Sequence, residues 1–100
     1  MTINKTLFIL GQQKSMLQQT QSILQDYFAE IRTFTDVDEF LNSLHEVKPQ
    51  FILFGGAITE AIRVRVKDEV ARNNLQIKFI EPRAPSEILS ATLKLIMPNS

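Results

Sequence analysis

Short runs of consecutive apolar residues alternate along the chain with longer segments in which apolar residues recur at helical spacing. The short runs predict four β-strands, at residues 6–10, 30–35, 50–54 and 76–80. The longer segments predict four helices, at residues 15–28, 36–47, 59–73 and 85–98. The first helix is expected to turn Leu17, Thr20, Ile23 or Leu24, and Tyr27 or Phe28 towards the core.

Residues that favour helix ends support these boundaries. Asp36 followed three positions later by Glu39 has the spacing of a capping box, and Thr59 is suited to cap the third helix. Pro49 is expected to stop the second helix, because proline lacks a donor and disfavours helical geometry in the residue before it. Pro85 fits the first turn of the last helix and Pro98 its end.

This alternation of strands and helices predicts one α/β domain spanning residues 1–100, with three layers, α/β/α. The run at 50–54 is continuously apolar, which indicates a central strand covered on both faces. The segment 30–35 alternates between apolar and polar residues and therefore belongs at an edge. We expect a flavodoxin-like (β/α)4 fold with a four-stranded parallel sheet in the order 2-1-3-4.

The composition excludes several kinds of chemistry. The 100 residues contain no cysteine and one histidine, His45, so disulfides, thiolate catalysis and multi-histidine metal sites are excluded. Eleven basic and eleven acidic residues cancel, and no apolar run approaches the length of a membrane span. These features predict a cytoplasmic protein with no membrane partner and no nucleic-acid partner.

Glycines follow the first and third predicted strands, where ligands of open α/β sheets bind. Gly11, Gly55 and Gly56, with Thr59 at the next helix start, could present backbone N–H groups to an anion. Alternatively, the glycines only permit positive φ in tight turns. Glu81 could be a charged group in the same crevice, binding a cation or acting as a base, or it could be solvated or paired with Arg83.

Two stretches resemble the receiver domain of response regulators (CheY-like). Residues 40–54 resemble its second helix and third strand, and residues 79–89 resemble its last strand and helix. Where receivers carry magnesium-binding acids this chain has Gly11 and Gln12, and Gly55 replaces the phospho-accepting aspartate. Glu81 replaces the active-site lysine. The resemblance implies a degenerate receiver, shortened by about one β-α unit, and a cis bond between Glu81 and Pro82.

Without those acids the chain cannot hold Mg²⁺ or form a phosphoaspartate in the receiver manner, so phosphotransfer is not expected. Too few groups remain for acid–base or nucleophilic catalysis, and we expect no enzyme activity, no metal and no cofactor. One hypothesis is a non-catalytic module for protein interaction or dimerisation in signalling or regulation. The other is a domain that binds a small ligand or anion in the glycine crevice.

The fourth strand and the third helix are candidate contact surfaces. A shortened sheet would expose the edge at Gln76, Lys78 and Ile80, and an unpaired edge recruits a protein partner or a second copy. The third helix carries several basic residues among acidic ones, which indicates a solvated face rather than a nucleic-acid stripe; they are Arg63, Arg65, Lys67 and Arg72.

Overall fold

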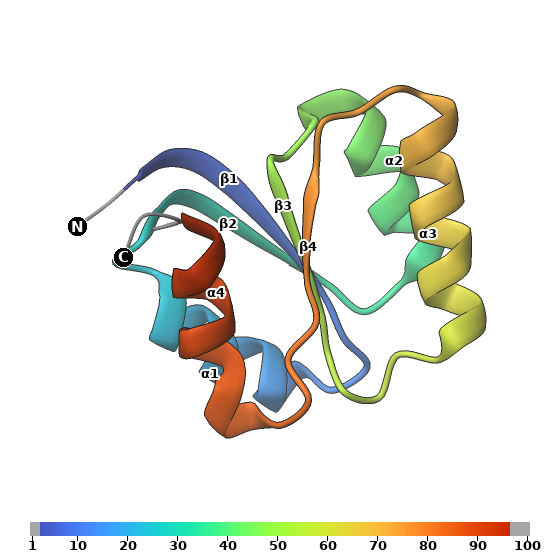
Figure 1. Cartoon of the computed structure of the whole chain (residues 1–100). Coiled ribbons are helices and arrows are strands. Elements are labelled where there is room, and N and C mark those ends of the chain that lie inside the picture. The colour runs from blue at the N-terminus through green and yellow to red at the C-terminus, as the bar shows by residue number, and fades with distance from the viewer. Residues whose placement is uncertain (1–2, 97–100) are drawn as a thin grey trace.

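The structure is a computed structural model that describes residues 3–96, in which strands and helices alternate throughout (Figure 1). The elements are β1 (Ile3–Leu10), α1 (Lys14–Leu24), β2 (Phe28–Phe34), α2 (Val37–Val47), β3 (Phe51–Phe54), α3 (Glu60–Arg72), β4 (Lys78–Ile80), a 3-10 turn η1 (Pro85–Glu87) and α4 (Ile88–Ile96).

The four strands form one parallel sheet in the order β2-β1-β3-β4, as the sequence predicted. Helices α1 and α4 cover one face and α2 and α3 cover the other, which gives the expected three layers (Figure 1). A single helix, α3, connects β3 to the edge strand β4. The flavodoxin-like arrangement is therefore confirmed, with all strands ending at the same edge of the sheet.

Alternate residues of the central strands divide the core into two clusters. Phe8 and Phe54 face α2 and α3, whereas Leu7 and Leu53 face α1 and α4. This follows from the two-residue period of a strand, which sends successive side chains to opposite faces. Every residue from Leu7 to Leu10 is fully buried, so β1 contributes equally to both cores.

The first helix ends earlier than its spacing predicts. Helix α1 stops at Leu24, and Phe28 starts β2, where it pairs with Ile3 of β1. Phe28 is buried with its ring centroid 5.5 Å from that of Phe51, so strand pairing and burial prevail over the helical period. Ile23, one of the expected inward residues, is 41% exposed.

The two predicted N-caps and the predicted stop at Lys48–Pro49 are present. Asp36 accepts hydrogen bonds from the N–H groups of Asp38 and Glu39, and Thr59 accepts one from Ile62. Lys48, before Pro49, adopts left-handed geometry with φ 55° and ends α2. These local signals fixed the helix boundaries because each satisfies backbone groups that the helix itself leaves unpaired.

Near the C-terminal end the structure departs from three expectations. Strand β4 is shorter than predicted and begins at Lys78. Pro85 opens the 3-10 turn, and α4 proper starts at Ile88. The expectation of a cis bond at Glu81–Pro82 is wrong, because the described residues contain no cis peptide. The predicted stop at Pro98 lies outside the described residues.

Candidate functional site at the carboxyl edge of the sheet

Gly55, directly after β3, lies against a side chain that no local sequence pattern places there. A Cβ atom on Gly55 would stand 2.4 Å from the methyl Cε of Met16 and 3.4 Å from the Cα of Gly11. Real Cβ atoms do not approach a carbon so closely. The methionine of α1 therefore occupies the space that a side chain at position 55 would fill, and it would have to move to admit one.

The other two glycines have different surroundings. A Cβ on Gly11 would lie 3.0 Å from Leu17 Cδ2, which makes a close fit, whereas one on Gly56 would meet nothing within 4 Å. None of the glycines has positive φ. The alternative that they serve tight turns by positive φ is therefore wrong, and steric contact accounts for Gly11 and Gly55 instead.

The backbone donors of the two buried glycines are already engaged. The N–H of Gly11 donates to the carbonyl of Phe34 at 3.0 Å, and the N–H of Gly55 donates to that of Leu10 at 2.8 Å. An anion at the crevice would have to replace one of these sheet bonds to use them. A binding role for Gly11, Gly55 and Gly56 stays a prediction, and Gly56 is the exposed member of the three.

A small cavity of about 70 Å³ opens beside Gly55 on the α1/α4 face. Met16 and Thr20 of α1, Leu53 of β3 and Ile88 of α4 form an almost entirely apolar wall. The segment that follows β4 completes the wall, and it includes Arg83, whose side chain is exposed. This space at the predicted ligand edge is therefore suited to carbon atoms.

Glu81 does not line this cavity but turns towards α3. Its carboxylate lies 3.2 Å from the ammonium of Lys67 and 3.8 Å from the guanidinium of Arg63. The expected partner, Arg83, is not among its contacts. Glu81 is thus paired, as one alternative proposed, but with the cations of α3.

The same two cations lie over aromatic rings. Arg63 stands 5.9 Å from the ring centroid of Phe54, and Lys67 stands 5.5 Å from that of Phe79. The two rings stack on one another with centroids 5.8 Å apart. The buried Nε of Arg63 has no hydrogen-bond partner among the described residues, and its guanidinium instead faces the ring. This layered contact fixes β4 to α3.

Thr59 acts as a helix cap rather than as a free hydroxyl. Its side-chain oxygen accepts from the N–H of Ile62 at 3.3 Å. Glu60 occupies the first turn that follows, where its negative charge already complements the helix dipole. An anion at this helix start would be repelled by Glu60, so the contribution predicted for Thr59 has no support in the local charges.

Carboxylates pair with all four basic residues singled out on α3. Besides the two bonded to Glu81, Arg65 lies 3.1 Å from Asp38 of α2, and Arg72 lies 2.9 Å from Asp68. A stripe for a phosphate backbone needs cations that are free to face it. The pairing fits the solvated, ion-paired face that the mixed charges indicated.

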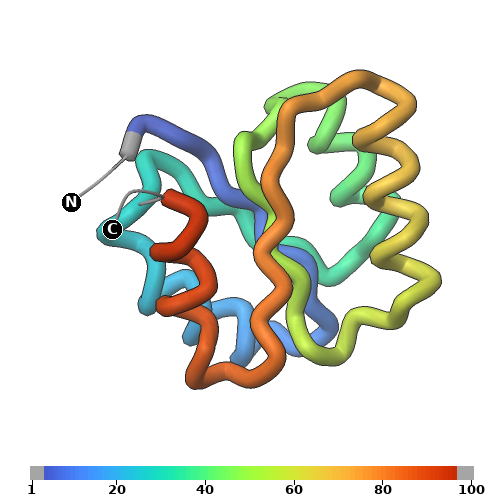
Figure 2. The backbone as a smooth tube through the Cα atoms, viewed as in Figure 1, coloured from blue at the N-terminus to red at the C-terminus, as the bar shows by residue number. Residues whose placement is uncertain are grey.

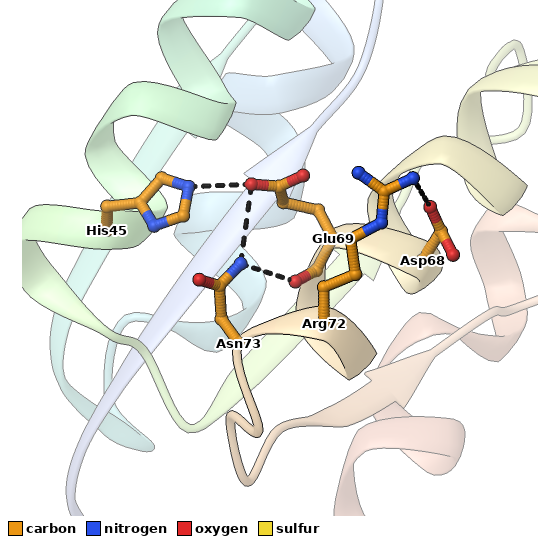
Figure 3. A network of polar contacts seen from close by, with 5 residues as sticks. All are labelled: His45, Asp68, Glu69, Arg72 and Asn73. Atoms are coloured by element: carbon orange, nitrogen blue, oxygen red, sulfur yellow. Dashed lines mark hydrogen bonds and ion pairs between the residues drawn. The ribbon is translucent and has the colours of Figure 1, made fainter.

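The single histidine belongs to a contact between two helices (Figure 3). His45 Nε2, near the end of α2, lies 2.8 Å from a carboxylate oxygen of Glu69 on α3. Asn73 donates to the backbone carbonyl of Glu69 at 2.8 Å. The contact joins the ends of two helices on the surface.

Strand β4 is the edge predicted as an interaction surface, but the outward groups differ from the predicted ones. The N–H of Lys78 donates to Gln50 beside β3, so the backbone groups of Lys78 and Ile80 point inward. Successive residues alternate, and those of Ile77 and Phe79 therefore point away from the sheet. The side chain of Ile80 is buried, and Gln76 precedes the strand.

Helix α4, which packs beside β4, carries several apolar residues that the core buries only in part. Ile88 and Thr92 are buried, while Leu89, Leu93 and Ile96 are only half-buried. Successive residues of a helix are turned by about 100° around its axis. Viewed down the axis of α4, its apolar side chains occupy one arc of about 200°, with Ala91 at one end and Leu93 at the other. A core-facing stripe needs only about half of that width. Figure 2 shows the backbone of α4 beside that of β4, so the partly exposed aliphatic side chains of α4 lie on the helix next to the edge strand.

Two kinds of site are absent from the part of the chain that the structure describes. Residues 3–96 contain no group of three or more histidine or acidic side chains placed to hold a metal ion. No helix within the same range has the length and apolar character needed to cross a membrane.

Comparison with known proteins identifies the fold and no family. No protein-family model matches the sequence, and no curated protein matches it. Among solved structures, the chain is similar to the N. crassa QDE-2 AGO MID domain, with a TM-score of 0.52 and 12% sequence identity. The match covers 98% of this chain and 100% of that one. At this identity the similarity shows a shared α/β architecture.

Proposed function

We propose that the chain is a non-catalytic, cytoplasmic, receiver-like interaction module in signalling or regulation, and that it forms a homodimer through β4. The carrying observation is the outward edge at Ile77 and Phe79, which pairs with no other strand of residues 3–96, with the half-buried aliphatic surface of α4 beside it. Two copies related by a two-fold axis would pair these edges antiparallel, so that each outward N–H and C=O finds a partner.

Several features favour a second copy as the occupant of this edge. The net charge of zero places no overall repulsion between two copies. Lys78 is the one charged side chain in β4, which is slight protection for an edge strand. The α4 surface would be covered in the same contact, and burial of apolar area stabilises an assembly more than the few edge hydrogen bonds do.

The geometry at the carboxyl edge supports a role without catalysis. Met16 fills the space over Gly55, where a receiver would carry its phospho-acceptor, and Glu81 is neutralised by Arg63 and Lys67. His45, the side chain best suited to proton transfer, is paired at the far ends of α2 and α3. These arrangements leave no described pair of reactive groups directed at a common point.

Sedimentation of the variants Ile77→Pro and Ile77→Ala tests the proposal. Both truncate the side chain, but only proline removes the outward N–H, and neither removes a bond between β3 and β4. A two-fold contact loses that donor twice, so we expect Ile77→Pro to weaken the dimer about tenfold or more relative to Ile77→Ala. Circular dichroism checks that both variants keep the fold.

Two results would contradict this assignment. Wild-type protein that sediments as a monomer up to about 1 mM, the range of very weak association, would exclude the homodimer. Equal weakening by alanine and proline would show that the side chain, and not the backbone edge, forms the contact.

A second candidate function is binding of a small ligand at the carboxyl edge, favoured by the cavity beside Gly55. Thermal unfolding with phosphate, nucleotides, Mg²⁺ with a phosphoryl mimic, and small metabolites tests it. A ligand at a hundred times its dissociation constant should stabilise the domain by about 2.7 kcal/mol, which is several degrees. Unchanged unfolding temperatures across the panel would exclude this function for those ligand classes.

A further inference from the structure

The geometry points to a site for a short aliphatic carboxylate in the cavity beside Gly55, covered by Met16 and directed by Arg83. This inference rests on the second candidate function and names its ligand class. It accounts for three observations together: the apolar wall, the flexible side chain over a glycine, and a cation at the rim that has no partner within residues 3–96.

The walls of the cavity select apolar atoms. Leu53, Ile88 and Met16 contribute hydrocarbon and thioether groups to it. Thr20 lines it too, but its hydroxyl already donates to the carbonyl of Met16 at 2.9 Å. A polar group placed deep in the cavity would lose water without gaining a partner there, whereas a hydrocarbon chain would lose nothing.

The size of the cavity limits the chain to a few carbon atoms. A dry apolar cavity of about 150 Å³ holds a benzene molecule, and this one measures about 70 Å³. If the Met16 methyl moved away from Gly55, the cavity would extend into the space that it leaves, because Gly55 has no Cβ to fill that space. Methionine has three flexible side-chain torsions and repacks at low cost. Gly55 and Met16 thus form an expandable end to the cavity.

Arg83 supplies the charge that selects a carboxylate. It lies at the rim, is exposed, and has no hydrogen bond or ion pair with any of residues 3–96. Glu81, two positions earlier, is held by Lys67 on the other side of β4 and does not neutralise it. A guanidinium binds a carboxylate through two parallel N–H donors, which would hold the head group in place with the chain inside.

NMR titration with butyrate and with butan-1-ol, observing methionine and isoleucine methyl groups, tests the inference. We expect butyrate to shift the Met16 and Ile88 methyl signals in a saturable way, with a dissociation constant on the order of 1 mM for so small a ligand. Butan-1-ol shares the chain but lacks the charge, and should bind about tenfold or more weakly. Propionate and hexanoate then measure the length limit.

Two variants separate the carboxylate from the cavity. Arg83→Gln, at an exposed position, should remove the preference for butyrate over butan-1-ol while leaving butan-1-ol binding unchanged. Ala84→Leu, which adds carbon atoms in the cavity wall, should weaken both ligands. Lys94→Gln, an exposed cation on α4 that does not line the cavity, is the matched control and should change neither.

The possible failures are distinct. Absence of a saturable shift at Met16 and Ile88 overturns the inference, and so does equal binding of both ligands with no effect of Arg83→Gln. If phosphate or a nucleotide stabilises the domain while butyrate leaves these methyl groups unchanged, the ligand class is wrong and the second candidate function stands. Sedimentation behaviour bears on the dimer alone.

Discussion

The two faces of the sheet are held in different ways. On one face, Arg65–Asp38 and His45–Glu69 pairs join α3 to α2, and three phenylalanine rings contact one another beneath them. On the other face, no ion pair or side-chain hydrogen bond joins α1 to α4 within residues 3–96. That second face also contains the cavity beside Gly55.

This difference separates structural residues from candidate functional ones. The α2/α3 face combines a closely packed aromatic core with the two surface ion pairs between α2 and α3, which limits its freedom to rearrange. The α1/α4 face has a methionine over a glycine, a half-buried aliphatic helix and a free strand at its margin. Both the dimer contact and the ligand site that we propose involve this less constrained side.

The largest expected effect comes from the aromatic core of the α2/α3 face. Phe40 is fully buried, with its ring centroid 5.7 Å from that of Phe8 and 5.3 Å from that of Phe34. We expect Phe40→Ala to lower the free energy of unfolding by about 3–5 kcal/mol, because it leaves a cavity in a closely packed core. Urea unfolding measures this loss.

Val64→Ala is the control for the core variant, since Val64 lies on α3 with 55% of its surface exposed. We expect it to change the free energy of unfolding by no more than about 0.5 kcal/mol. A loss below about 1 kcal/mol for Phe40→Ala would contradict the view that this face supplies most of the rigid packing.

The contact between Met16 and Gly55 should show as an energetic coupling. Gly55→Ala brings a methyl group against Met16 Cε, so we expect a loss of about 1 kcal/mol, the lower limit for overpacking, because the methionine can move. In a Met16→Ala background the same change should be nearly neutral. Additive losses in this double-mutant cycle would show that the two residues do not interact.

Gly56→Ala should stabilise the domain rather than destabilise it. A Cβ there meets nothing within 4 Å, and the residue does not have positive φ. Alanine restricts the unfolded chain more than glycine does, and we expect a gain of about 0.4–1 kcal/mol in urea unfolding. A loss would mean that the turn requires a conformation that only glycine adopts.

The smallest effect is expected for the surface ion pairs between α2 and α3. Glu69→Gln weakens the contact with His45, and exposed ion pairs contribute only about 0.2–1 kcal/mol. Glu46→Gln is the matched control, because Glu46 is exposed on α2 and forms no ion pair within residues 3–96. Equal unfolding free energies for the two variants would show that the His45–Glu69 contact contributes nothing measurable to stability.

The amino-acid sequence by itself determined the order and type of the elements, the parallel sheet and most helix ends. Those properties depend on local signals: the period of apolar residues, a capping aspartate at Asp36, a capping threonine at Thr59, and proline after Lys48. The strand order 2-1-3-4 was predicted from the flavodoxin-like pattern, in which the continuously apolar run at 50–54 is central and the alternating segment 30–35 lies at an edge. The α1 boundary was missed because burial of Phe28 against Phe51 involves a residue distant in the sequence.

The tertiary structure alone decided how the candidate site is built. Met16 and Gly55 are 39 positions apart, and no local pattern places a methionine methyl over a glycine. Glu81 pairs with Lys67 of α3, 14 positions away, and not with the nearby Arg83, because the packing of α3 brings Lys67 within 3.2 Å of its carboxylate. The outward direction of Ile77 and Phe79 depends on the register between β3 and β4. Contacts of this kind arise between elements, whereas sequence periodicity describes each element singly.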